Sequence, residues 1–177
     1  MTARTRRGRR SPVEPHTVPT AVADMDEETI APLFDRPLIP VANDDDAAAT
    51  AAAVLPRIAA NGGDPVFVHV IEKAGGAPDK ASVEQREELA EEMFDFIREE
   101  SDDAGVEVET TLRYGTDVAA TIIDTAHDIG ATCITFTPRG GKRWWDLFSG
   151  DTRESLVTKS DLPVVVLPAA DTAEVDA

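Results

Sequence analysis

Apolar residues between positions 36 and 168 occur in short blocks separated by longer amphipathic stretches. Five blocks are rich in Val, Ile, Leu and Phe and have the length of strands, whereas four stretches place apolar residues at helical spacing. The sequence therefore predicts five strands and four helices in strict alternation. The expected strands are 37–42, 66–71, 106–114, 132–136 and 163–167; the expected helices are 44–60, 82–103, 118–129 and one that starts near Trp144 or Asp151 and ends at Lys159.

This order predicts the fold class. Strands that alternate with helices form a parallel sheet, because only crossover connections join parallel neighbours. We expect an α/β fold with three αβα layers: an open five-stranded parallel sheet covered by helices on both faces. Residues 106–110 alternate between apolar and polar, which is typical of an edge strand with one wet face. The helix over 82–103 is expected to turn one face inward, and this face carries Leu89, Met93, Phe96 and Ile97.

Charge narrows the possible functions. The chain has 34 acidic and 17 basic residues among 177, a net charge of −17 and a pI near 4.4. So acidic a protein is a poor ligand for the phosphate backbone of nucleic acids. Only four of the basic residues are lysines. High acidity with little lysine suggests a halophilic protein, because concentrated salt screens repulsion between surface charges.

Both ends of the chain differ from its centre. Five arginines lie between Arg4 and Arg10, and a polar, Pro-rich stretch follows. A signal peptide would need an apolar stretch there, and no apolar run is long enough to span a membrane. We therefore expect a disordered tail over 1–33, a start at Met25 as the alternative, and a cytoplasmic protein without membrane contact. The folded domain is expected over 34–168, followed by an acidic tail over 169–177.

The loop after the fourth expected strand holds the strongest candidate for a binding site. Gly140 and Gly141 allow the backbone to approach a ligand closely, and Arg139, Lys142 and Arg143 add positive charge beside them. Gly150 lies at the start of the last expected helix, where free backbone N–H groups favour anions. These features predict a site for a phosphate or another small anion.

At this point the chain resembles the universal stress protein (UspA-like) family. The resemblance covers about residues 36–168 and rests on the order of elements, on 68–70, on the Tyr114-Gly115 pair, and on the segment 159–166. It implies a Rossmann-like fold of the adenine nucleotide alpha hydrolase type and a role in stress response. Gly140 and Gly150 match the second and third glycines of the family's ATP-binding motif at the right spacing.

Three positions depart from that motif. Thr137 stands where the first glycine belongs, Asp151 replaces the following Ser or Thr, and Ala42 replaces an aspartate at the end of the first strand. A carboxylate at 151 would repel phosphate, while Thr152 could supply the missing hydroxyl. The resemblance thus implies a degenerate nucleotide loop, with ATP as one candidate ligand. The residues expected to form the site are Val41, Ala42, Val70, Thr137, Arg139, Gly140, Gly141, Gly150, Asp151 and Thr152.

Other chemically active residues have simpler explanations. His69 lies in a buried strand and is expected to be structural, and Cys133 is expected to be a small buried hydrophobe. The acids at 44–46 match the positive end of a helix dipole better than a metal site. Of Trp144 and Trp145, one is expected to pack under the last helix, and the other to be exposed as a surface for a ligand or a partner.

The last expected strand has consecutive apolar residues near the chain end, and an uncovered edge strand of this kind tends to pair. The family commonly pairs this strand across a twofold axis, so we expect a homodimer through Val164, Val165 and Val166. The resulting interpretation is a binding or signalling module without efficient catalysis. The alternatives are an ATP-binding switch or slow ATPase, and a protein-interaction module without a small-molecule ligand.

Overall fold

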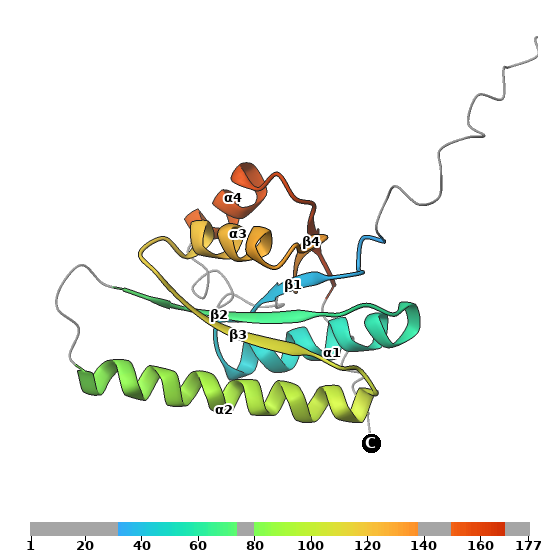
Figure 1. Ribbon diagram of the computed structural model, residues 1–177, viewed down its shortest axis with the longest axis horizontal. Coiled ribbons are helices and arrows are strands. Elements are labelled where there is room, and N and C mark those ends of the chain that lie inside the picture. Colours follow the sequence, from blue (N-terminus) through green and yellow to red (C-terminus); the bar gives the residue numbers. More distant parts are fainter. Residues whose placement is uncertain (1–31, 74–79, 138–149, 169–177) are drawn as a thin grey trace, which may run out of the picture. The chain divides into compact units, whose positions relative to one another are not determined.

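A computed structural model describes residues 32–73, 80–137 and 150–168, which all belong to one compact unit, Ala31–Ala177. Strands and helices alternate along these residues, so the predicted α/β class is confirmed (Figure 1). None of the helices in the described ranges is long and apolar enough to cross a membrane. The elements are β1 (Pro37–Pro40), α1 (Asp44–Asn61), β2 (Val66–Glu72), α2 (Lys80–Ala104), β3 (Glu109–Gly115), α3 (Val118–Asp128), β4 (Cys133–Phe136), α4 (Gly150–Lys159) and β5 (Val164–Val166).

The five strands form one sheet in the order β3-β2-β1-β4-β5, and every neighbouring pair is parallel. β1 is central, and its Leu38 pairs with Val66 of β2 on one side and Ile134 of β4 on the other. β3 and β5 are the two edges of the sheet, as the alternating pattern of the third strand and the position of the last had suggested. Strand order reverses between β1 and β4, at the centre of the sheet.

Alternate residues of the central strands enter two separate cores. Ile39 and Phe67 pack in a core with α1 and α2, whereas their neighbours Leu38, Val66 and Val68 pack in a core with α3 and α4. Figure 1 shows these helix pairs on opposite sides of the sheet. Since the central strands bury both faces, they read as continuous apolar runs in the sequence.

The first turn of α1 is closed by two side chains. Asn43 is the N-cap, and its Oδ1 accepts a 2.9 Å hydrogen bond from the N–H of Asp46. The carboxylate of Asp46 reaches back and accepts a 2.8 Å bond from the N–H of Ala42. This reciprocal cap explains one member of the acidic run 44–46 without a metal ion. No cluster of three or more His, Cys, Asp and Glu side chains suited to a metal is found in the described ranges.

Helix α2 buries a face different from the expected one. Met93 and Ile97 are buried as predicted, but Leu89 is 53% exposed and Phe96 is only partly buried. Ala90 and Phe94 take the inner positions instead. The same spacing fits two faces of this helix, and its contact with α1 as well as with the sheet rotates the buried stripe toward Ala90 and Phe94.

Strand β3 begins three residues later than expected. The N–H of Val106 donates to Ser101 O at 2.9 Å, which closes the end of α2 after Gly105 in the left-handed region. Val106 is therefore part of the helix terminus, and pairing with β2 starts at Glu109.

Candidate functional site

β1 and β4 are the neighbouring strands between which chain order reverses, and their carboxyl ends lie at the same edge of the sheet. In open α/β sheets this position lies between diverging loops and is the usual place for a ligand. Val41 follows β1, and Thr137 follows β4. The register that pairs Leu38 with Ile134 sets Val41 and Thr137 at the same level of the sheet. We call the space between these two strand ends the fork.

On the β1 side of the fork, β2 and α1 already engage the polar groups of the backbone. The N–H of Val41 donates to Val68 O at 2.9 Å, and Val41 O is 2.9 Å from Nδ1 of His69. The N–H of Ala42 is bound to the Asp46 carboxylate. Val41 is buried and Ala42 half-buried, so they can form an apolar wall but offer no free amide.

On the β4 side a polar atom is left without a partner. Thr137 is only 5% exposed, and its Oγ1 has no hydrogen-bond partner among the described residues. An unsatisfied buried hydroxyl costs about 1–3 kcal/mol, and native proteins seldom tolerate one without a reason. Thr137 is also the residue that replaces the first motif glycine.

The structure places the remaining expected site residues unevenly. Val70 of β2 is half-buried and packs in the core beneath α3 and α4. Gly150 begins α4, and Thr152 in its first turn is half-buried and engaged in an interaction. The side chain of Asp151 lies outside the described part of the chain. Outside it too are Arg139, Gly140, Gly141, Lys142, Arg143, Trp144 and Trp145.

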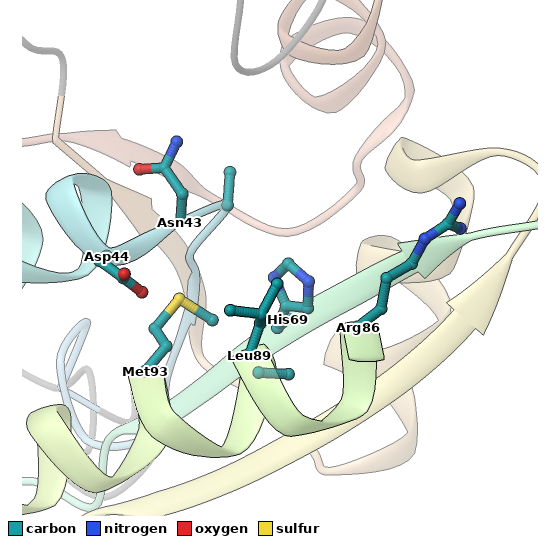
Figure 2. Close-up of a pocket in the computed structure, with 8 residues that line it drawn as sticks. Asn43, Asp44, His69, Arg86, Leu89 and Met93 are labelled. Atoms are coloured by element: carbon teal, nitrogen blue, oxygen red, sulfur yellow. The ribbon is translucent and has the colours of Figure 1, made fainter. Parts of the chain in front are cut away.

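A cavity of about 200 Å³ lies on the other side of the β1 end, where the β1–α1 junction faces α2. Ala42 belongs to its wall, so the cavity adjoins the fork. Figure 2 shows side chains from three elements directed toward one space: Asp44 of α1, His69 of β2, and Leu89 and Met93 of α2. Asn43, Arg86 and Ala90 complete the lining. The exposure of Leu89 is thereby explained, because it forms an open wall of this cavity.

His69 has a structural bond, as predicted, but also a free nitrogen. A carbonyl oxygen only accepts hydrogen bonds, so Nδ1 of His69 must donate its proton to Val41 O. The neutral ring then carries an unprotonated Nε2, which has no partner among the described residues. The β1–β2 pairing therefore determines which nitrogen of His69 can accept a hydrogen bond.

Two charged side chains, Asp44 and Arg86, belong to the lining of the cavity. Arg86 donates a 3.3 Å bond from Nη1 to Glu72 O and pairs with no described carboxylate. Close by in the sequence, Glu87 follows Arg86 in α2 and accepts a hydrogen bond from the Tyr114 hydroxyl, and this bond raises the pKa of Tyr114. The Nζ of Lys73 lies 5.4 Å from the Tyr114 ring centroid. The lining thus carries both signs of charge, from Asp44 and Arg86, although the protein is strongly acidic.

Cys133 is fully buried in β4, and its Sγ is 3.2 Å from Thr135 Oγ1. Burial raises the pKa of the Cys133 thiol, which opposes formation of a nucleophilic thiolate. The prediction that Cys133 is a buried hydrophobe is confirmed.

Sequence reasoning did not find the cavity. Leu89 was expected inside and Arg86 was not considered, because nothing in the local pattern of α2 shows that it faces the β1–α1 junction. Asp46 was recognised only as part of an acidic run. The sequence did draw attention to Thr137, because it replaces the first glycine of the motif. Only the fold shows that the side chain of Thr137 is buried.

Comparison with known proteins agrees with this architecture. A universal stress protein from Burkholderia pseudomallei shares 22% identity and superimposes with a TM-score of 0.62 over 78% of this chain and 99% of its own. A universal stress protein in complex with cAMP (11% identity, TM-score 0.60) covers 78% of this chain and 100% of its own. One from Archaeoglobus fulgidus in complex with dAMP (21% identity, TM-score 0.51) covers 77% and 99%.

No curated protein is significantly similar to the sequence. The model of the universal stress protein family matches residues 34–168, which is most of the chain and includes every described strand and helix. The chain therefore belongs to the universal stress protein family.

Proposed function

We propose that residues 34–168 form a binding and signalling module that recognises a nucleotide or another small anion at the fork, without efficient catalysis. The observation that carries this proposal is the buried hydroxyl of Thr137, which has no partner among the described residues and lies where strand order reverses. A ligand that enters the fork would give this hydroxyl a hydrogen bond and would recover the cost of leaving it unpaired.

Two further observations support a nucleotide as the ligand. Structures of similar fold contain cAMP and dAMP, although their identity of 11% and 21% is low. In the sequence, Arg139, Gly140 and Gly141 follow closely after Thr137. The positive charges of Arg139, Lys142 and Arg143 in this segment would favour an anionic ligand.

The proposal is tested by titrating the protein with dAMP, cAMP, ATP and inorganic phosphate, using calorimetry and thermal unfolding in concentrated salt. A ligand present at a hundred times its Kd raises the stability of the native state by about 2.7 kcal/mol. We expect a saturable signal for at least one of these compounds. Absence of heat and of any thermal shift at millimolar ligand would end the small-anion proposal.

Two threonine variants test the part played by Thr137. A neutral hydrogen bond contributes about 0.5–1.5 kcal/mol, so Thr137→Val should weaken binding roughly two- to tenfold without loss of stability. Thr50→Val is the matched control, because Thr50 in α1 is also buried and its hydroxyl also lacks a partner in the described part of the chain, but it lies in a helix away from the fork. Unchanged affinity in Thr137→Val, with binding intact in the wild type, would remove Thr137 from the site.

A second candidate is an ATP-binding switch or slow ATPase. Thr152 in the first turn of α4 favours it, because its hydroxyl could replace the one that the family carries at 151. Charge repulsion between Asp151 and phosphate opposes it, at roughly 1–4 kcal/mol for charges about 4 Å apart. If that repulsion decides the ligand, Asp151→Ser should raise affinity for ATP more than for dAMP. Equal changes in the affinity for ATP and for dAMP would argue against the ATP-binding switch or slow ATPase.

A third feature supports an interaction function. β5 is an edge strand, and its Val166 is 52% exposed while Val164 and Val165 are half-buried. We propose that two copies pair along β5, because this would cover an apolar edge. Val166→Lys should give monomers in light scattering, and Val157→Lys, at an exposed valine of α4, should not. A monomeric wild type in concentrated salt would exclude the dimer.

A further inference from the structure

The cavity beside α2 presents hydrogen-bond acceptors over an apolar wall. His69 supplies Nε2, which accepts a hydrogen bond because Nδ1 is held as a donor by Val41 O. Asp44 supplies a carboxylate that has no partner among the described residues. In Figure 2 both side chains are directed toward the space that Met93 and Leu89 border.

The side-chain donors of the lining are directed away from Asp44 and His69. The Oδ1 of Asn43 accepts the Asp46 N–H as the N-cap of α1, and in Figure 2 the Asn43 amide points away from Met93 and His69. The Arg86 guanidinium is bonded to Glu72 O, and in Figure 2 it extends away from Asp44 and His69. The interior therefore suits a ligand that donates hydrogen bonds, and its carboxylate suits one with positive charge.

The apolar wall and the volume limit the size of that ligand. Leu89, Ala90 and Met93 provide one continuous side from α2. An apolar cavity of roughly 150 Å³ holds a benzene ring, whereas sites that enclose a drug-sized molecule measure about 300–1,000 Å³. A cavity of about 200 Å³ thus accommodates one ring with a short substituent. Methionine sulfur also packs favourably against aromatic rings.

The charge of the whole protein favours the same ligand. A net charge of −17 attracts small cations toward the surface and disfavours anions. Arg86 in the lining moderates this field locally, and its one partner within the described ranges is the carbonyl oxygen of Glu72. The overall potential and the local acceptors thus both favour a cationic ligand that donates hydrogen bonds.

We propose that this cavity is a second ligand site, which takes a small cationic amine carried on a single ring. The ammonium group would donate to the Asp44 carboxylate and to Nε2 of His69, and the ring would pack on Leu89, Ala90 and Met93. This site adjoins the fork at Ala42 but is distinct from it, because its ligand contacts come from α1, β2 and α2 and its ligand carries the opposite charge.

Benzylamine is the probe, with benzoate and benzyl alcohol as controls that reverse or remove the charge. Calorimetric titrations should use the lowest salt at which the protein remains folded, since screening weakens the ion pair. We expect saturable binding of benzylamine, much weaker binding of the alcohol and none of benzoate. Absence of saturable benzylamine binding would overturn the proposal.

Substitutions locate the binding within the molecule. Asp44→Asn should weaken benzylamine binding roughly fivefold, whereas Asp45→Asn removes the same charge from the same turn but from a residue outside the lining, and should have little effect. His69→Asn can keep the donor to Val41 O while removing Nε2, and should weaken binding by a similar factor. Ala90→Leu should abolish binding by filling the cavity.

Equal losses in Asp44→Asn and Asp45→Asn would show a general charge effect and would refute the site, as would full affinity in Ala90→Leu. If His69→Asn does not fold, the Asp44 and Ala90 variants still decide the question. Nucleotide titrations of the same variants separate the two proposals. Loss of benzylamine binding with intact nucleotide binding supports two sites, and failure of nucleotide binding alone leaves this one in place.

Discussion

Replacing either of two buried threonines by valine should change the stability of the protein, with opposite sign at the two positions. Thr50 in α1 is 1% exposed, and its hydroxyl has no partner among the described residues. Thr125 in α3 is 2% exposed, but its hydroxyl donates a 2.7 Å bond to Thr121 O. Replacing either residue by valine keeps the shape and leaves helix propensity almost unchanged. The difference between the two variants therefore isolates the state of the hydroxyl.

The expected magnitudes follow from hydrogen-bond energetics. An unsatisfied buried group costs about 1–3 kcal/mol, so Thr50→Val should stabilise the protein by that amount. Thr125→Val loses a made bond with a net contribution of about 0.5–1.5 kcal/mol and should destabilise. For a chain of this length 1 kcal/mol moves Tm by about 2–4 °C. We expect Tm to rise by roughly 2–10 °C in the first variant and to fall by a few degrees in the second.

Urea unfolding at fixed salt measures both changes. With a slope of about 1–3 kcal/mol per molar urea, the midpoints should move in opposite directions by several tenths of a molar or more, at unchanged slope. A fall in midpoint for Thr50→Val would mean that this hydroxyl has a partner. The same result would weaken the argument for Thr137, which rests on the same observation.

Three further predictions concern backbone, pH and salt. Gly63 has φ +127°, and a Cβ there would lie 2.1 Å from Phe34 O, so Gly63→Ala should lower the free energy of unfolding by roughly 3 kcal/mol or more. Gly62 has φ +80° but lies in open space, so Gly62→Ala should lower it by about 1–2 kcal/mol. The same urea assay measures both changes. Burial raises the pKa of Cys133, so the unfolded thiol ionises first; above about pH 8.5 the free energy of unfolding should fall with rising pH, and Cys133→Ala should lack this fall. A net charge of −17 predicts that stability rises between about 0.1 and 1 M KCl as the Debye length shrinks from about 10 to 3 Å; thermal unfolding that is indifferent to salt would exclude the halophilic interpretation.

Local pattern was sufficient for the fold. Apolar blocks bounded by glycine and polar residues located every strand, and alternation with helices required parallel pairing. The third strand appeared as an edge because Glu107 and Glu109 alternate with apolar residues, and the fork follows from the strand order of the family that the chain resembles. The strands, the helices and the edge position of the third strand depend on near neighbours in the chain, whereas the fork came from the resemblance.

Tertiary contacts decided the details of both proposed sites. The spacing of apolar residues in α2 fits a face with Leu89 as well as one with Ala90 and Phe94, and only packing against α1 and the sheet selects the second. His69 acquires an accepting Nε2 because Val41, 28 positions earlier, binds its other nitrogen. Such features arise between residues far apart in the chain, whose distance and orientation are set only when all layers pack together.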